Sequence, residues 1–195
     1  MLTEAIHRYQ RKQTRIGGVC GILIPIVLFL SLACALSYSP WFNWTKHALS
    51  DLGISGVSSF FFNSGMVICG ILAFFFSLGL SKILVNKIGV YLLCISSLAM
   101  IGIGLFPETI GGLHFVVSAT SFMLLAISLL IVGLTIMRNK TERPIGILAF
   151  VFIVPALIGS LILLPSLKGI AISETLVWFP AFFWMMIYGL RMMFF

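Results

Sequence analysis

The sequence predicts an all-α polytopic membrane bundle of six transmembrane helices, with a short interfacial helix in the first external loop. Of the 195 residues, 61% are hydrophobic and only 9% are charged, whereas a soluble domain has about 25% charged residues. Six segments are also apolar over the roughly 20 residues that are needed to cross a bilayer. These two observations exclude soluble, disordered and disulfide-stabilised classes of protein.

The six spans follow one another with short connections, and we expect them to form a single domain over residues 1–195. Their approximate bounds are 16–36, 59–80, 88–106, 113–137, 145–165 and 175–193. The four cysteines lie inside these spans without a CxxC pair, so we interpret them as small buried apolar residues rather than as zinc ligands.

The basic residues predict the orientation of the bundle. Six spans put both termini on the same side, and of the 12 Lys and Arg residues only Lys46 and Lys168 then fall on the opposite side. The positive-inside rule therefore predicts a protein of the cell membrane with cytoplasmic termini. This explains the net charge of +7 without a nucleic-acid partner. The expected partner is membrane lipid, and a homo-oligomer or a second membrane protein stays open. The basic residues on the side of the termini are Arg8, Arg11, Lys12, Arg15, Lys82, Lys87, Arg138, Lys140, Arg143 and Arg191.

The longest connection, residues 37–58, is external and carries the most informative motif. Ser39 followed by Pro40 is typical of a helix start, and Gly53 is a suitable stop. The segment between them predicts a helix of roughly three turns, too short to cross the bilayer. On such a helix His47 and Asp51 have i, i+4 spacing and can touch.

Further polar residues lie at the same outer boundary of the membrane, where unpaired polar groups are costly and are therefore functional candidates. We expect them to meet in a pocket that opens outward. Glu174, which follows Ser173, is expected to cap the sixth helix instead. The predicted catalytic residues are His47, Asp51, Glu108 and His114, and the predicted ligand-binding residues are Trp44, Ser50, Asn63, Ser118 and Trp178.

Two kinds of chemistry fit these residue types. His47, Asp51 and His114 can ligate Zn²⁺ and leave a position open for water, which would attack an ester or amide of a lipid. In a metal-free version, Asp51 orients His47 as a general base and Ser50 or Ser118 is the nucleophile. A simpler interpretation is a local His47–Asp51 pair beside interfacial tryptophans. The residue types do not decide among these.

The stretch HALSDLG from His47 to Gly53, followed by Asn63, Phe106-Pro107-Glu108 and His114, resembles a known family. It is the domain-of-unknown-function family 998, whose members are small six-helix prokaryotic membrane proteins. The resemblance covers nearly the whole chain. It implies that the external polar motifs are a feature of the family, and it implies no particular activity.

The leading hypothesis is therefore an outward-facing polar pocket that binds, and as an enzyme would hydrolyse or modify, a lipid or another amphipathic small molecule. A small-molecule transporter is an alternative, although no charged residue lies near the middle of a span, which argues against ion-coupled transport. An accessory membrane subunit whose external loop docks a partner is another alternative.

Overall fold

The computed structural model describes residues 2–195 and confirms the six-helix prediction. The helices are α1 (Leu2–Ser37), α2 (Gly56–Leu80), α3 (Ile88–Leu105), α4 (Gly112–Met137), α5 (Arg143–Leu163) and α6 (Ala171–Met192). Each is long and apolar enough to cross a membrane, and no strand is found in residues 2–195. The chain is thus an all-α, multi-pass membrane protein.

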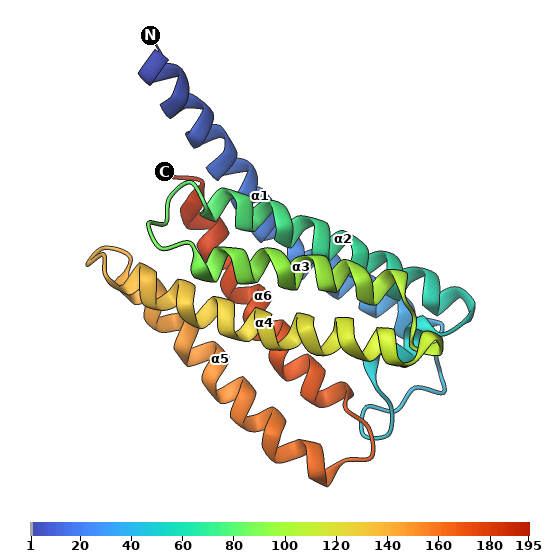
Figure 1. Ribbon diagram of the computed structural model, residues 1–195. Coiled ribbons are helices and arrows are strands. Elements are labelled where there is room, and N and C mark those ends of the chain that lie inside the picture. Colours follow the sequence, from blue (N-terminus) through green and yellow to red (C-terminus); the bar gives the residue numbers. More distant parts are fainter. Residues whose placement is uncertain (1) are drawn as a thin grey trace.

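Each helix packs against its neighbours in sequence, and α6 closes the ring against α1. Both termini lie at one end of the bundle (Figure 1). We call this end, with the loops 81–87 and 138–142, the terminal end, and the opposite end the outer end. The amino-terminal turns of α1 project beyond the other helices (Figure 1), because this helix begins at Leu2 rather than near residue 16.

Small residues let α1 fit between its two neighbours. A Cβ added to Gly17 would lie 2.8 Å from the Cα of Gly79 on α2, and one added to Gly18 would lie 2.7 Å from the carbonyl oxygen of Gly189 on α6. Such close backbone approach is typical of helix packing in membranes. The core is completed by large aromatic side chains of α6, including Trp178 and Trp184.

The predicted interfacial helix is wrong. Only Leu49–Gly53 is helical, as a single 3-10 segment, η1, and residues 38–48 form turns. In an α-helix the His47 carbonyl would accept the Asp51 N–H, but here it accepts the N–H of Ala171 at 3.0 Å. The Thr45 carbonyl likewise accepts the Gly169 N–H at 3.0 Å. Pairing with the loop between α5 and α6 therefore replaces the hydrogen bonds that a local helix would make.

Candidate functional site

The η1 segment is the centre of the polar structure at the outer end. The Leu49 N–H donates to the Glu174 carboxylate at 2.6 Å, and the Ser50 hydroxyl donates to the Glu108 carboxylate at 2.9 Å. The Asp51 carboxylate accepts the N–H of Ala48 at 3.1 Å. The three consecutive residues Ala48, Leu49 and Ser50 thus each donate a hydrogen bond to a different carboxylate. The carboxylates come from η1 itself, from the short 3-10 segment η2 (Glu108–Ile110) and from the first turn of α6.

The electrostatic setting of this acidic cluster, formed by Asp51, Glu108 and Glu174, is unusual. The Glu174 side chain is buried, with 8% of the residue exposed, and the charges of Glu108 and Asp51 both act on it. No Lys or Arg side chain among the described residues forms an ion pair with any of the three. The positive end of the α6 dipole and the Leu49 N–H are the favourable contacts of Glu174. The cluster therefore carries negative charge that the protein balances only in part.

Asn63 holds η1 against α2. Its side-chain N–H donates to the Gly53 carbonyl oxygen at 3.0 Å, and its side-chain oxygen has no partner within the described residues although it is buried. A Cβ added to Gly53 would overlap that oxygen, which explains why glycine suits this position. The structure thus places Asn63 beside the cluster as a support for the η1 backbone.

His114 forms a second polar group, in the first turn of α4. Its Nδ1 lies 2.7 Å from the Phe106 carbonyl oxygen and its Nε2 lies 3.3 Å from the Ser118 hydroxyl. A carbonyl oxygen can only accept, so Nδ1 carries the proton and Nε2 is left as an acceptor. The ring is therefore held in the tautomer that can receive a proton from Ser118.

The expected pairing of His47 with Asp51 is not formed. The His47 Nδ1 accepts the Asn43 N–H at 2.9 Å, and the His47 ring packs against Trp41 with ring centroids 5.2 Å apart. Asp51 instead bonds to the Ala48 N–H. The physical reason is the missing helix, because i, i+4 side chains meet only when the backbone between them is helical. Within residues 2–195, moreover, no three His, Cys, Asp or Glu side chains are arranged to hold a metal ion, so His47, Asp51 and His114 do not form a ligand set here.

The two predicted tryptophans have different surroundings. Trp44 is exposed in the first loop and packs edge-to-face against Phe42. Trp178 is 2% exposed and stacks on Phe122 of α4, with centroids 4.7 Å apart. Trp178 therefore belongs to the packed core of the bundle and not to the outer polar groups.

Sequence reasoning missed Glu174 as a site residue. Its position in the first turn of a helix has a local explanation, since acidic residues favour that position. The signal that could have identified it is its setting: it is one of only five acidic residues in the chain, and it stands at the start of an apolar span. Leu49, its partner, lies 125 residues away in sequence.

The geometry allows two chemical roles. The acidic cluster can accept hydrogen bonds from a cationic or donor-rich group, and the His114–Ser118 pair has the donor–acceptor order of a general base and a hydroxyl nucleophile. The two groups are neighbours along the chain, because Glu108 precedes the helix that carries His114.

Comparison with known proteins supplies the identity of the chain at family level. A family model described as "Protein of unknown function (DUF998)" matches residues 19–191. No similar curated protein and no similar solved structure was found. The match extends from the middle of α1 into α6 and includes both outer polar groups, as the resemblance of the HALSDLG and Phe106-Pro107-Glu108 motifs predicts. The chain is therefore a member of the membrane-protein family DUF998, whose function is unknown.

Proposed function

We propose that the outer end binds the headgroup of an amphipathic molecule, with donors of that headgroup contacting Asp51 and Glu108. The observation that supports this is the acidic cluster, which has no basic side chain paired to it among the described residues. Neighbouring like charges are unfavourable unless a cation or a donor balances them. An ammonium group brings a positive charge and three donors.

The surroundings favour a lipid as the carrier of that ammonium group. Asp51 and Glu108 each use one oxygen in the bonds described above, which leaves the other oxygen for a ligand. Exposed apolar side chains flank the cluster at Trp44, Ile54 and Val57, and they can contact acyl chains. Phosphatidylethanolamine has the required donors, whereas the quaternary ammonium of phosphatidylcholine has none.

The test is native mass spectrometry of the full chain in mild detergent, titrated with the two lipids at equal acyl composition. We expect the wild type to retain phosphatidylethanolamine over phosphatidylcholine, and an Asp51→Asn/Glu108→Gln variant to lose that preference. Glu4→Gln, which removes an exposed carboxylate at the other end, is the control and keeps it. Equal retention of both lipids by the wild type would overturn the proposal. Loss of a co-purifying protein in the variant would instead favour the accessory-subunit alternative.

A second candidate function is acyl transfer by the His114–Ser118 pair. The supporting observation is the 2.7 Å contact of Nδ1 with the Phe106 carbonyl, which leaves Nε2 as the acceptor towards the Ser118 hydroxyl. The 3.3 Å separation is within the looser range of a ligand-free nucleophile–base pair. A fluorophosphonate probe, which labels activated serines, should modify the wild type and not Ser118→Ala or His114→Ala. Equal labelling of all three proteins would dismiss this function.

We also propose that the terminal end faces the cytoplasm and that the membrane is the cell membrane. The supporting observation is the distribution of the 12 basic residues, of which only Lys46 and Lys168 belong to the outer end. In a cysteine-free background, a membrane-impermeant maleimide added to intact cells should label Lys46→Cys and not Lys140→Cys. The reverse pattern would overturn the orientation.

A further inference from the structure

The amino-terminal half of α1 carries an uninterrupted stripe along one face. Arg8, Arg11, Lys12 and Arg15 have the i, i+3, i+4, i+7 spacing that places side chains on the same side of a helix. All four are exposed. The stripe continues without a break into Ile16, Val19 and Cys20, so its character changes from cationic to apolar between residues 15 and 16.

The same seven residues line a cavity of about 430 Å³. Its apolar part is open to the surroundings, because Ile16 is 47% and Val19 is 43% exposed. From Arg8 to Val19 the stripe extends about 16 Å along the helix axis, at 1.5 Å per residue. Because α1 is long and apolar enough to cross a membrane, a stripe of this length can reach from the headgroup region into the first part of the hydrocarbon.

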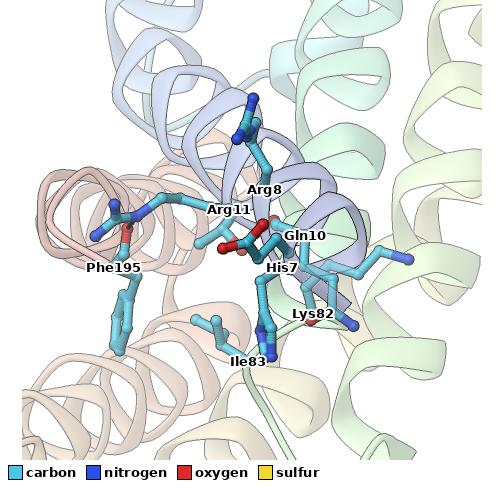
Figure 2. Close-up of a pocket in the computed structure, with 9 residues that line it drawn as sticks. His7, Arg8, Gln10, Arg11, Lys82, Ile83 and Phe195 are labelled. Carbon is cyan, nitrogen blue, oxygen red and sulfur yellow. Dashed lines mark hydrogen bonds between the residues drawn. The ribbon is translucent and has the colours of Figure 1, made fainter. Parts of the chain in front are cut away.

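A second cavity, of about 570 Å³, shares Arg8 and Arg11 with the first and adds His7 and Lys82. Figure 2 shows the Arg11 side chain beside Phe195, with Arg8 pointing away from it. The Arg11 Nε donates to the Phe195 backbone oxygen at 2.9 Å, so this arginine is held in place while the cations around it face open space. Positive charge thus surrounds both cavities at the start of the span.

Little acidic charge is available to balance it. Glu4 is the one acidic side chain that lines these two cavities among the described residues. Glu142, the other acidic residue of the terminal end, is already bonded to Arg191. The described acidic side chains therefore cannot balance all of Arg8, Lys12 and Arg15, and further counter-charge comes from outside the protein.

We infer that the α1 stripe binds an anionic phospholipid, with the phosphate among Arg8, Lys12 and Arg15 and an acyl chain along Ile16 and Val19. Guanidinium groups match the geometry of phosphate oxygens, and the apolar continuation at the right depth selects a lipid over a soluble anion. This site lies at the opposite end of the bundle from the acidic cluster and takes the opposite charge. It does not depend on the function proposed above.

The inference is tested on the purified full chain in mild detergent by native mass spectrometry, with phosphatidylglycerol and phosphatidylcholine of equal acyl composition. We expect the wild type to retain phosphatidylglycerol preferentially. The Arg8→Gln/Lys12→Gln/Arg15→Gln variant should lose that preference by about tenfold or more, because each basic residue near the headgroups contributes separately. Arg11 is left unchanged because it contacts Phe195.

The matched control removes the same charge from exposed positions of the same end, as Lys87→Gln/Lys140→Gln/Arg143→Gln. It should keep the preference of the wild type, because these three residues do not line the α1 cavity. An equal loss in both triple variants would show diffuse attraction to positive charge and would overturn the site. Absence of any preference in the wild type would overturn it as well. Helical circular dichroism of all variants checks that the bundle is folded.

A competition experiment separates the lipid from its headgroup. Inorganic phosphate and glycerophosphoglycerol carry the anionic chemistry without acyl chains. Neither should displace phosphatidylglycerol at equal concentration, since the contacts with Ile16 and Val19 are then missing. Displacement by either one would show that the stripe binds soluble anions, and would contradict a lipid site.

Discussion

The two ends of the bundle handle charge in opposite ways. At the outer end, three carboxylates are bonded to backbone N–H groups and to a hydroxyl around Leu49–Gly53. At the terminal end, the basic residues of α1 are exposed on one face, and Arg11 is the only one of them with a side-chain hydrogen bond to another described residue. The acids are thus built into the tertiary structure, whereas the cations are presented to the surroundings. The two proposals above rest on this difference: a donor-rich headgroup at the outer end and an anionic phospholipid at the terminal end.

Two buried glutamates, one at each end of the bundle, show this contrast in how acidic groups are bonded. Glu142 at the terminal end is 4% exposed, and Arg191 contacts it at 2.6 Å, with a second bond from the arginine Nε at 2.8 Å. Glu174 at the outer end is similarly buried but accepts a backbone N–H and has no cation bonded to it among the described residues. A buried carboxylate is therefore paired with an arginine at one end and with a backbone N–H at the other.

The largest expected effect on stability comes from removing the arginine that is paired with Glu142. Arg191→Met leaves Glu142 buried without its cation, and we expect a loss of about 3 kcal/mol in the free energy of unfolding. This is the low end of the range for buried pairs, because a third of the Arg191 side chain is exposed. Unfolding in mixed micelles by increasing denaturing detergent measures it. Arg191→Met/Glu142→Leu should recover much of the loss. A single variant as stable as the wild type would contradict the pair's role.

The next effect distinguishes charge from hydrogen bonding at the outer end. Glu174→Ala leaves the Leu49 N–H without an acceptor, and we expect a loss of about 2 kcal/mol. Glu174→Gln keeps an acceptor for the Leu49 N–H and removes a buried ionisable carboxyl group, so it should match or exceed the wild type. The same unfolding assay compares the two. If Gln destabilises as much as Ala, the negative charge itself is required, and the comparison between the ends fails.

A smaller effect is expected for the bond between η1 and η2. Ser50→Ala removes the hydroxyl donor to Glu108, which should cost about 1 kcal/mol. Ser166→Ala, at an exposed position beside the last external loop, is the control and should be neutral. The apparent unfolding temperature in detergent is a sufficient measurement. A loss shared by both serine variants would show that the effect is not specific to the acidic cluster.

The smallest effect on stability is expected for an exposed basic residue at the terminal end. Lys140→Gln alters an exposed cation, and we expect a change within about 0.5 kcal/mol. The measurement is the same detergent titration, carried out beside Ser50→Ala. A loss larger than that of Ser50→Ala would mean that exposed cations of the terminal end also hold the structure together, which would remove the distinction between the ends.

Much of the fold was predictable because the signals are local. Hydropathy over a window of about 20 residues indicates a span wherever the other spans lie, and each predicted span overlaps an observed helix. Gly53 and Asn63 were also recognisable as parts of one motif group, and they contact each other. The loop between α1 and α2 was predicted wrongly because its helix-start and helix-stop residues are also local signals. Here the backbone bonds from Gly169 and Ala171 outweigh them.

The sequence by itself determined the class of the protein, its six spans, the asymmetry of its charge and its family resemblance. These depend on composition and on short periodic patterns. Only the tertiary structure decided that Glu174 meets Leu49, that Glu142 is buried against Arg191, and that His47 is separated from Asp51. The reason is that the two glutamate contacts, and the backbone bonds from Gly169 and Ala171 that shape the loop around His47, join segments from different loops and helices. Their partners are chosen by how the helices pack and by where each buried polar group finds its hydrogen bond, neither of which is encoded within a single window of sequence.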